Sequence, residues 1–177
     1  MSEAKFCLLT TRDSSEWDHI VRSSPQGTLF SESLYLNLAG INHISYIIKQ
    51  GNHIKAGISL TMSEDKEKCC LDDLVIYGGL LFVPVTSKKE VRRRYEQYEL
   101  TEFTINYLAS KFSGIELTLS PQFEDMRPFL WHEYHNQKAE SHFKLDLRYT
   151  SYVDISSLTN KDDENTSAFL GMEKLRQ

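Results

Sequence analysis

The densest cluster of chemically capable side chains is the stretch DMRPFLWHEYH, residues 125–135. Two carboxylates, an arginine, a tryptophan, a tyrosine and two histidines lie within one segment that contains a proline. Such side chains can hold a metal, catalyse a reaction or line a binding groove. Their spacing, and the elements that position them, decide between these three roles.

A metal site does not fit this spacing. His132, Glu133 and His135 lack the H-E-x-x-H pattern that places two imidazoles on one helical face. Nucleophilic catalysis fits no better, because no serine lies in a G-x-S-x-G elbow. We therefore expect no bound metal and no serine nucleophile.

One interpretation of the stretch is purely structural. Pro128 fixes the turn, and Phe129 to Trp131 pack under a sheet. Asp125 either pairs with Arg127 or caps the turn that follows.

The alternative interpretation is a binding groove. Arg127 would hold an anionic group such as a phosphate or carboxylate, while Trp131 and Tyr134 supply a flat stacking wall. Three residues on the polar face of the last expected strand would line the same groove: Arg148, Tyr152 and Asp154.

Composition narrows the class of protein. The chain has 177 residues, 40% of them apolar, and a formal net charge of −5, which suits one globular domain and disfavours a nucleic-acid-binding surface. Its three cysteines, Cys7, Cys69 and Cys70, do not suit a disulfide framework. No stretch approaches the ~20 apolar residues that cross a bilayer. We expect a cytoplasmic protein without an integral membrane segment and without a DNA partner.

Hydrophobic periodicity predicts the elements that position the 125–135 stretch. They are, in order, an apolar strand at 6–9, a helix capped by Asp13 or Ser14, a helix from about Ser31 to Gly40, a hairpin at 43–63, a strand near 70–83, a long helix from Ser87 to Gly114, and strands near 115 and 145. Gly78 and Gly79 predict a bulge or a close approach of backbone. The order predicts an α+β domain with a central mixed, largely antiparallel sheet flanked by helices.

This order of elements resembles the GNAT N-acyltransferase fold, and three passages narrow the resemblance. EWDHIVRSSPQGTLFSESLYLNL is similar to the opening of the Fem-type peptidoglycan-bridge aminoacyltransferases and of related nucleotide-sugar N-acyltransferase-like proteins. GGLLFVP is similar to their strand before the long helix, and DMRPFLWHEYHNQ with RYTSYVDIS to their aspartate-arginine-proline-aromatic segment and the strand after it. The resemblance covers most of residues 14–157 and is nearest to one half of a Fem-type protein, the N-terminal one.

The resemblance implies a GNAT-like domain at residues 1–157, followed at 158–177 by a polar linker and a terminal helix. It implies an N-acyltransferase acting on an amine of a bacterial cell-wall precursor or a nucleotide sugar. The donor would be an acyl-CoA or an aminoacyl-tRNA, with no tightly bound cofactor. We assign Asp154 as the base that takes the proton of the amine.

Fem-type proteins are similar to two such halves in tandem, and this chain stops where a second half would begin. The turn before the long helix, VTSKKE, also lacks the glycines that bind donor phosphates. The alternative function is therefore a non-catalytic half, or a binding module for an anionic, sugar-bearing ligand.

The end of the chain adds an expectation about association. A polar loop is followed by apolar residues on a plausible short helix: Ala168, Phe169, Leu170, Met172 and Leu175. These side chains either dock on the domain's own core or bind another chain, whether a second GNAT-like half or a second copy.

Overall fold

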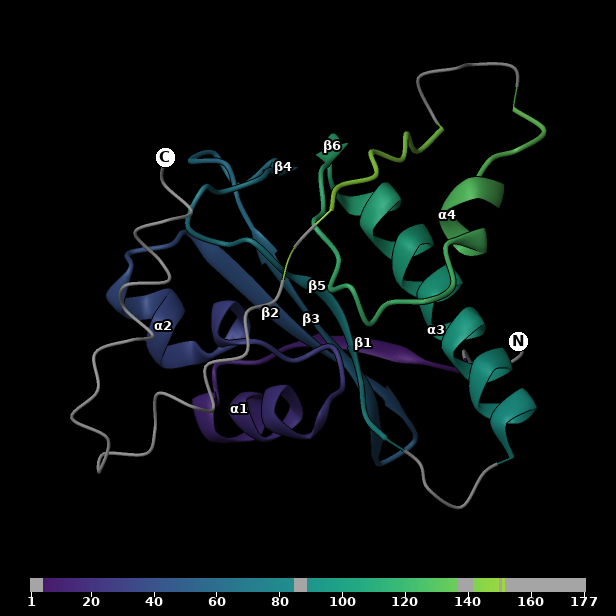
Figure 1. Ribbon diagram of the computed structural model, residues 1–177, viewed down its shortest axis with the longest axis horizontal. Coiled ribbons are helices and arrows are strands. Elements are labelled where there is room, and N and C mark those ends of the chain that lie inside the picture. Colours follow the sequence, from purple (N-terminus) through teal and green to yellow (C-terminus); the bar gives the residue numbers. More distant parts are fainter. Residues whose placement is uncertain (1–4, 85–88, 137–141, 150, 152–177) are drawn as a thin grey trace, which may run out of the picture. The chain divides into compact units, whose positions relative to one another are not determined.

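The computed structural model describes residues 5–84, 89–136, 142–149 and 151. The chain divides into two compact units, residues 1–144 and 145–177, and all assigned helices and strands lie in the first (Figure 1). They are β1 (Cys7–Thr10), α1 (Ser14–Ser23), the 3-10 helix η1 (Leu29–Ser31), α2 (Ser33–Leu38), β2 (His43–Gln50), β3 (His53–Thr61), β4 (Lys68–Cys69), β5 (Gly79–Phe82), α3 (Glu90–Lys111), β6 (Gly114–Ile115) and α4 (Arg127–Trp131). None of the described helices is long and apolar enough to span a bilayer.

Four strands form the main sheet in the order β1-β2-β3-β5, with every neighbouring pair antiparallel. The turn between β2 and β3 contains Gly51, whose φ of 57° is a left-handed conformation that glycine adopts without steric cost. Parallel pairing occurs between β4 and β6, and where Gly78 bridges Leu119. The predicted α+β class, with a mixed, largely antiparallel sheet flanked by helices, is confirmed.

Helices cover both faces of the main sheet (Figure 1). On one face α1 places Trp17 and Ile20 against Ile47 and Leu81. On the other face α3 contributes Leu108 to a core formed with alternate residues of the strands: Tyr46, Ile48, Ala56, Ile58, Leu60, Leu80 and Phe82. Successive residues of a strand point to opposite faces, so β2 and β5 each supply both cores.

Two polar contacts hold α3 to the sheet. Lys55 of β3 lies 3.0 Å from a carboxylate oxygen of Glu96. At the other end of α3, Lys111 Nζ donates to the hydroxyl of Tyr46 at 2.5 Å and lies over its ring at 4.8 Å. That hydrogen bond raises the pKa of Lys111, so the ammonium form is favoured at this position. The register of α3 on the sheet is fixed at both ends.

A glycine in the central strand lets α1 approach the sheet closely. A Cβ on Gly57 would lie 2.8 Å from Cζ3 of Trp17, which is closer than real side chains pack. The Trp17 indole is fully buried here, and its Nε1 donates to the Ser31 carbonyl at 2.7 Å. The absence of a side chain at residue 57 therefore sets the distance between these two layers.

The helix and turn signals near the N-terminus are confirmed. Asp13 caps α1 by accepting from the backbone N–H groups of Ser15 and Glu16, at 2.9 and 3.1 Å. Gly40 follows α2 with a φ of 67°. Local capping chemistry accounts for both boundaries.

Other sequence predictions are wrong in extent. The strand near 70–83 is regular only over Gly79–Phe82, since residues 73–77 form turns and bends. The long helix is regular over Glu90–Lys111, and its buried residues begin at Leu100, whereas Val91 and Tyr95 are exposed.

The strand near 145 is also wrong for the part of it that is described. Residues 142–149 contain no strand, and Leu147 and Tyr149 are exposed. Alternation of apolar residues permits a strand, but a neighbouring strand must supply the hydrogen bonds. The predicted boundary at residue 157 and the predicted helix within 158–177 lie outside the described residues.

Replacing Gly57 by alanine tests the role of the missing side chain. We expect Gly57→Ala to lower the free energy of unfolding by about 1–3 kcal/mol, because the new methyl group overpacks Trp17. Gly114→Ala is the matched control, since a Cβ there meets only the flexible Lys68 side chain, at 3.5 Å. Urea denaturation of both variants measures the difference, and equal stabilities would contradict the close-packing account.

Candidate substrate-binding site between α3 and α4

The segment that follows β6 runs alongside the start of β5 in the main sheet. Gly78 N–H donates to the Thr118 carbonyl at 2.9 Å, and a Cβ on Gly79 would lie 2.5 Å from Cδ2 of Leu119. Gly79 also has a φ of 77°. The expected close approach of backbone at Gly78 and Gly79 is therefore confirmed, and the approaching segment is the one that leads to α4.

The buried amide of Gln26 holds this segment to β5. Its Oε1 accepts from the backbone N–H of Phe82 at 3.1 Å and from the Ser24 hydroxyl at 3.0 Å. Its Nε2 donates to the Gln122 carbonyl at 3.1 Å. Gln26 is only 6% exposed, so water cannot take the place of its amide as hydrogen-bond partner of the Phe82 N–H and the Gln122 carbonyl.

A row of packed aromatic rings connects β5 to α4. Phe123 stacks on Phe82 of β5 at 5.7 Å between ring centroids, and Phe129 packs edge-on against Phe123 at 6.0 Å. Phe129 in turn contacts Phe143 at 5.4 Å. Pro128 occupies the first turn of α4, where its missing N–H costs no hydrogen bond. The buried side of α4 is thereby fixed against the core, and α4 lies along α3 (Figure 1).

Arg127 forms a two-bond ion pair with Asp125. Its Nε and Nη2 donate to the two carboxylate oxygens at 2.8 and 2.6 Å. These hydrogen bonds hold the pKa of Asp125 below its ordinary value. The guanidinium also lies over the rings of Tyr98, at 5.3 Å, and Trp131, at 5.8 Å. The expected pairing of Asp125 with Arg127 is confirmed, and the charge of Arg127 is already balanced.

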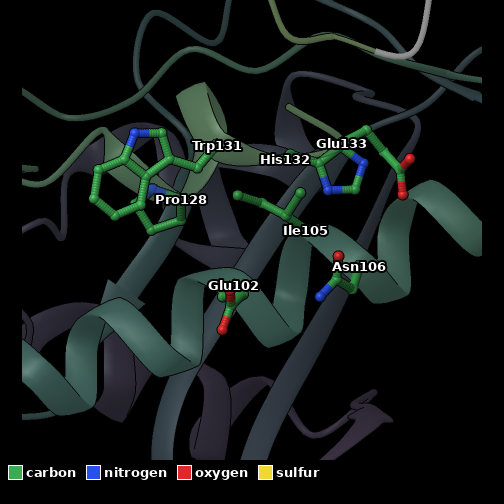
Figure 2. Close-up of a pocket in the computed structure, with 7 residues that line it drawn as sticks. All are labelled: Glu102, Ile105, Asn106, Pro128, Trp131, His132 and Glu133. Atoms are coloured by element: carbon green, nitrogen blue, oxygen red, sulfur yellow. The ribbon is translucent and has the colours of Figure 1, made fainter. Parts of the chain in front are cut away.

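A pocket of about 140 Å³ lies between α3 and α4 (Figure 2). Its lining residues are Glu102, Ile105, Asn106, Pro128, Trp131, His132 and Glu133. The volume admits one small group, such as an amine with the start of its alkyl chain, and not a whole nucleotide. The lining contains two carboxylates, an imidazole and a carboxamide but no lysine or arginine. This composition favours a cationic or hydrogen-bond-donating group.

The backbone after α4 turns sharply to place His132 and Glu133 at the pocket. Glu133 has a φ of 52°, a left-handed conformation that costs a non-glycine residue about 1–2 kcal/mol. Its carbonyl accepts from His142 Nε2 at 3.0 Å, and its carboxylate accepts from Asn136 at 3.2 Å. The His132 ring packs on Phe143 at 5.4 Å. These contacts hold the strained turn in place.

The residues predicted for the groove are only partly brought together. Arg127 and Trp131 are in contact, whereas the Tyr134 ring is exposed, packs on His135 at 5.5 Å and does not line the pocket. Trp131 is 55% exposed, so it does not pack under the sheet as the structural interpretation expects.

The remaining predicted site residues belong to the second unit. Arg148 pairs with Asp146 at 3.2 Å within that unit. Tyr152 and Asp154 lie outside the described residues. Their roles stay predictions.

Sequence reasoning missed the contribution of α3 to the site. Glu102 and Asn106 are one helical turn apart on α3, and both are among the residues that line the pocket (Figure 2). Their spacing places them on one side of the helix, but it gives no sign that α4 lies opposite. The sequence pattern raises His132 and Glu133 only as candidate metal ligands.

Neither a cluster of metal-binding side chains nor a reactive thiol at Cys69 is found in the described part of the chain. No three histidine, cysteine, aspartate or glutamate side chains there are placed to hold a metal ion. Cys69 is buried in β4, and burial raises the pKa of its thiol to about 12, which keeps it protonated at neutral pH.

Comparisons with known proteins give two structural matches. One is described as a possible acetyltransferase from Clostridium difficile 630, with 13% identity and a TM-score of 0.41 over 86% of this chain and 99% of that chain. The other is a GNAT family acetyltransferase from Staphylococcus aureus, with 10% identity and a TM-score of 0.35 over 85% of this chain and 100% of that chain. No protein-family model and no curated protein matches the chain. Similarity at these scores assigns no activity, and the nearer resemblance to Fem-type proteins stays a prediction.

Removing the Gln26 amide tests its hold on the segment that carries α4. We expect Gln26→Ala to lower the free energy of unfolding by about 1–3 kcal/mol, because the Phe82 N–H and the Gln122 carbonyl lose a buried partner. Gln122→Ala is the control, since that residue uses only its backbone carbonyl in the contact and its side chain is exposed. Chemical denaturation measures both, and an unchanged midpoint for Gln26→Ala would refute this role.

The pair of Asp125 and Arg127 predicts a pH dependence of stability. The pKa of Asp125 is depressed in the folded state, so its contribution is fully present above the unfolded value of about 3.9 and is lost as the pH falls through the lower folded value. We expect the stability gap between wild type and Asp125→Asn to be constant from neutral pH to about pH 5 and to shrink below about pH 4. Urea titrations across this range measure it, with Asp73→Asn, at an exposed site, as control. A gap that widens on acidification would contradict the assignment.

Proposed function

We propose that this chain is an N-acyltransferase domain whose pocket between α3 and α4 receives the amine end of the acceptor. The observation that carries the proposal is the pocket lining, with the carboxylates of Glu102 and Glu133, the imidazole of His132 and no lysine or arginine. Carboxylates attract an ammonium group, and the exposed indole of Trp131 adds a cation–π surface. The small volume selects the amine end of a larger molecule.

Acyl transfer requires the bound ammonium to lose a proton before it can attack. The neutral nitrogen then forms a bond to the acyl carbon of the donor, and the bond from that carbon to the donor's sulfur or oxygen breaks. The proton released from nitrogen is taken up by a base, and the leaving group is protonated. Among the described residues that line the pocket, His132 has the side chain suited to take this proton. Asp154, on the polar face of the last expected strand, remains the base predicted from the sequence.

The finer identity of the substrates rests on the sequence resemblance. It supports an acyl-CoA or an aminoacyl-tRNA as donor, and an amine of a cell-wall precursor or a nucleotide sugar as acceptor. A pocket of about 140 Å³ accommodates only the reacting end of such an acceptor. The sugar or peptide part would extend over the exposed surface of α4.

A second candidate is a binding module for an anionic, sugar-bearing ligand. The exposed rings of Trp131 and Tyr134 favour it, because sugars stack on aromatic faces. The Asp125 carboxylate weakens it, because an anion would have to share the Arg127 guanidinium with that side chain.

Direct assay of acyl transfer tests the first candidate. The purified chain is incubated with acetyl-CoA or an aminoacyl donor and a panel of primary amines, and acylated amine is measured by mass spectrometry. We expect His132→Ala to lower kcat by about 10²–10⁴-fold, the usual range for a general base, and Glu133→Gln to raise KM for the amine by about tenfold. His135→Ala and Glu64→Gln, at exposed positions outside the pocket, are the matched controls.

Thermal shifts separate the two candidates. A ligand at 100 times its dissociation constant adds about 2.7 kcal/mol of apparent stability. Stabilisation by amines or donors, with product formation, supports the transferase. Stabilisation only by nucleotide sugars, lost in Tyr134→Ala and kept in His132→Ala, supports the binding module. Absence of product with every donor and acceptor would refute the first candidate.

A further inference from the structure

The N-terminal half of α3 carries exposed apolar side chains. Val91 and Tyr95 are 80% and 63% exposed. Tyr98 continues the row and packs on the exposed Trp131, with 6.2 Å between ring centroids. Spacings of four, three and four residues place Val91, Tyr95, Tyr98 and Glu102 on one side of the helix. The exposed side chains of Val91 and Tyr95 thus adjoin the half-buried Tyr98 and the exposed Trp131, and such a group of neighbouring apolar residues, unlike scattered ones, marks an interaction surface.

Charge changes sign along this face. Arg92 flanks the row at its N-terminal end, and Glu102 closes it at its C-terminal end, about 15 Å away at 1.5 Å per residue. Neither residue forms an ion pair with any other residue in the described ranges of the chain. The neighbouring Arg94, by contrast, pairs with Glu90 at 2.7 Å. The face therefore offers one free cation and one free anion at opposite ends of an apolar row.

We propose that a second copy of this chain packs on this face, with the two α3 helices antiparallel. A two-fold axis close to residue 97 sets Arg92 of each copy opposite Glu102 of the other. Tyr95 of each copy then lies close to Tyr98 of the other, between the two ion pairs. A parallel arrangement would place Arg92 against Arg92, so the charge order selects the antiparallel one. The same patch is used by both copies, which gives a closed dimer.

The expected dimer is reversible. Half of one helix and the edge of α4 form a contact smaller than the 1,200–2,000 Å² typical of stable complexes. Its ion pairs are exposed, so salt weakens them. Glu102 also lines the pocket between α3 and α4, and the second copy would border the mouth of that pocket. The dimer does not depend on the chemistry proposed for the pocket.

Charge reversal tests the antiparallel pairing. Sedimentation velocity on the full chain over a concentration series gives the dissociation constant of the dimer at low and high salt. We expect Arg92→Glu and Glu102→Arg each to weaken the dimer by about tenfold or more, because each places like charges opposite one another at two points. The double variant, Arg92→Glu with Glu102→Arg, restores opposite charges and should recover the wild-type dissociation constant.

The control is Arg12→Glu, a reversal at an exposed arginine in the turn before α1. It should leave the dissociation constant unchanged, and circular dichroism confirms that every variant is folded. A wild-type chain that is monomeric at every concentration would overturn the proposal. So would a dimer that ignores the single reversals, or one that the double variant fails to restore. Acyl transfer by a strictly monomeric chain would overturn the dimer and leave the proposed function standing.

Discussion

The arrangement of the first unit depends on one buried carboxamide, that of Gln26. It connects three parts that are distant in the sequence: the turn after α1, the edge of β5, and the segment at Gln122. A carboxamide is suited to this position because it accepts from the Phe82 N–H and donates to the Gln122 carbonyl at the same time. A carboxylate could not donate, and an apolar side chain would leave two backbone groups unsatisfied. Everything that follows Gln122, including α4, starts from a point that this side chain holds.

The pocket is a consequence of that hold, with aromatic packing as the second cause. Phe123 and Phe129 continue from β5 to α4 and bury one side of the short helix. A helix of five residues has little stability of its own, so its position is set by these rings and not by its backbone. The other side of α4 is then free to present Trp131 and the residues after it to α3. The strained backbone at Glu133 is tolerated because its carbonyl and side chain both have hydrogen-bond partners.

The parts of the molecule that sequence predicted well are those governed by neighbours in the chain. The capping of α1 by Asp13, the hairpin around Gly51 and the pair of Asp125 with Arg127 all join residues a few positions apart. The pocket joins Glu102 to Glu133, and no local signal in either stretch identifies the other. The expected strand near 145 shows the same limit in its described part, because its alternation is clear but a strand also needs a partner strand that the pattern does not identify.

The contact between Trp17 and Gly57 has a consequence for how sequences with this fold can diverge. The indole occupies the volume that a side chain at residue 57 would fill, so neither position can vary alone without strain or a void. A chain that gains alanine or valine at 57 must shrink the residue at 17, and the Ser31 carbonyl then loses the donor that Trp17 provides. Substitutions at the two positions should therefore be inherited together, as a correlated pair between the first helix and the middle of the sheet. In related sequences, covariation between residues 17 and 57 would therefore indicate that the helix and the sheet are in close contact at this point.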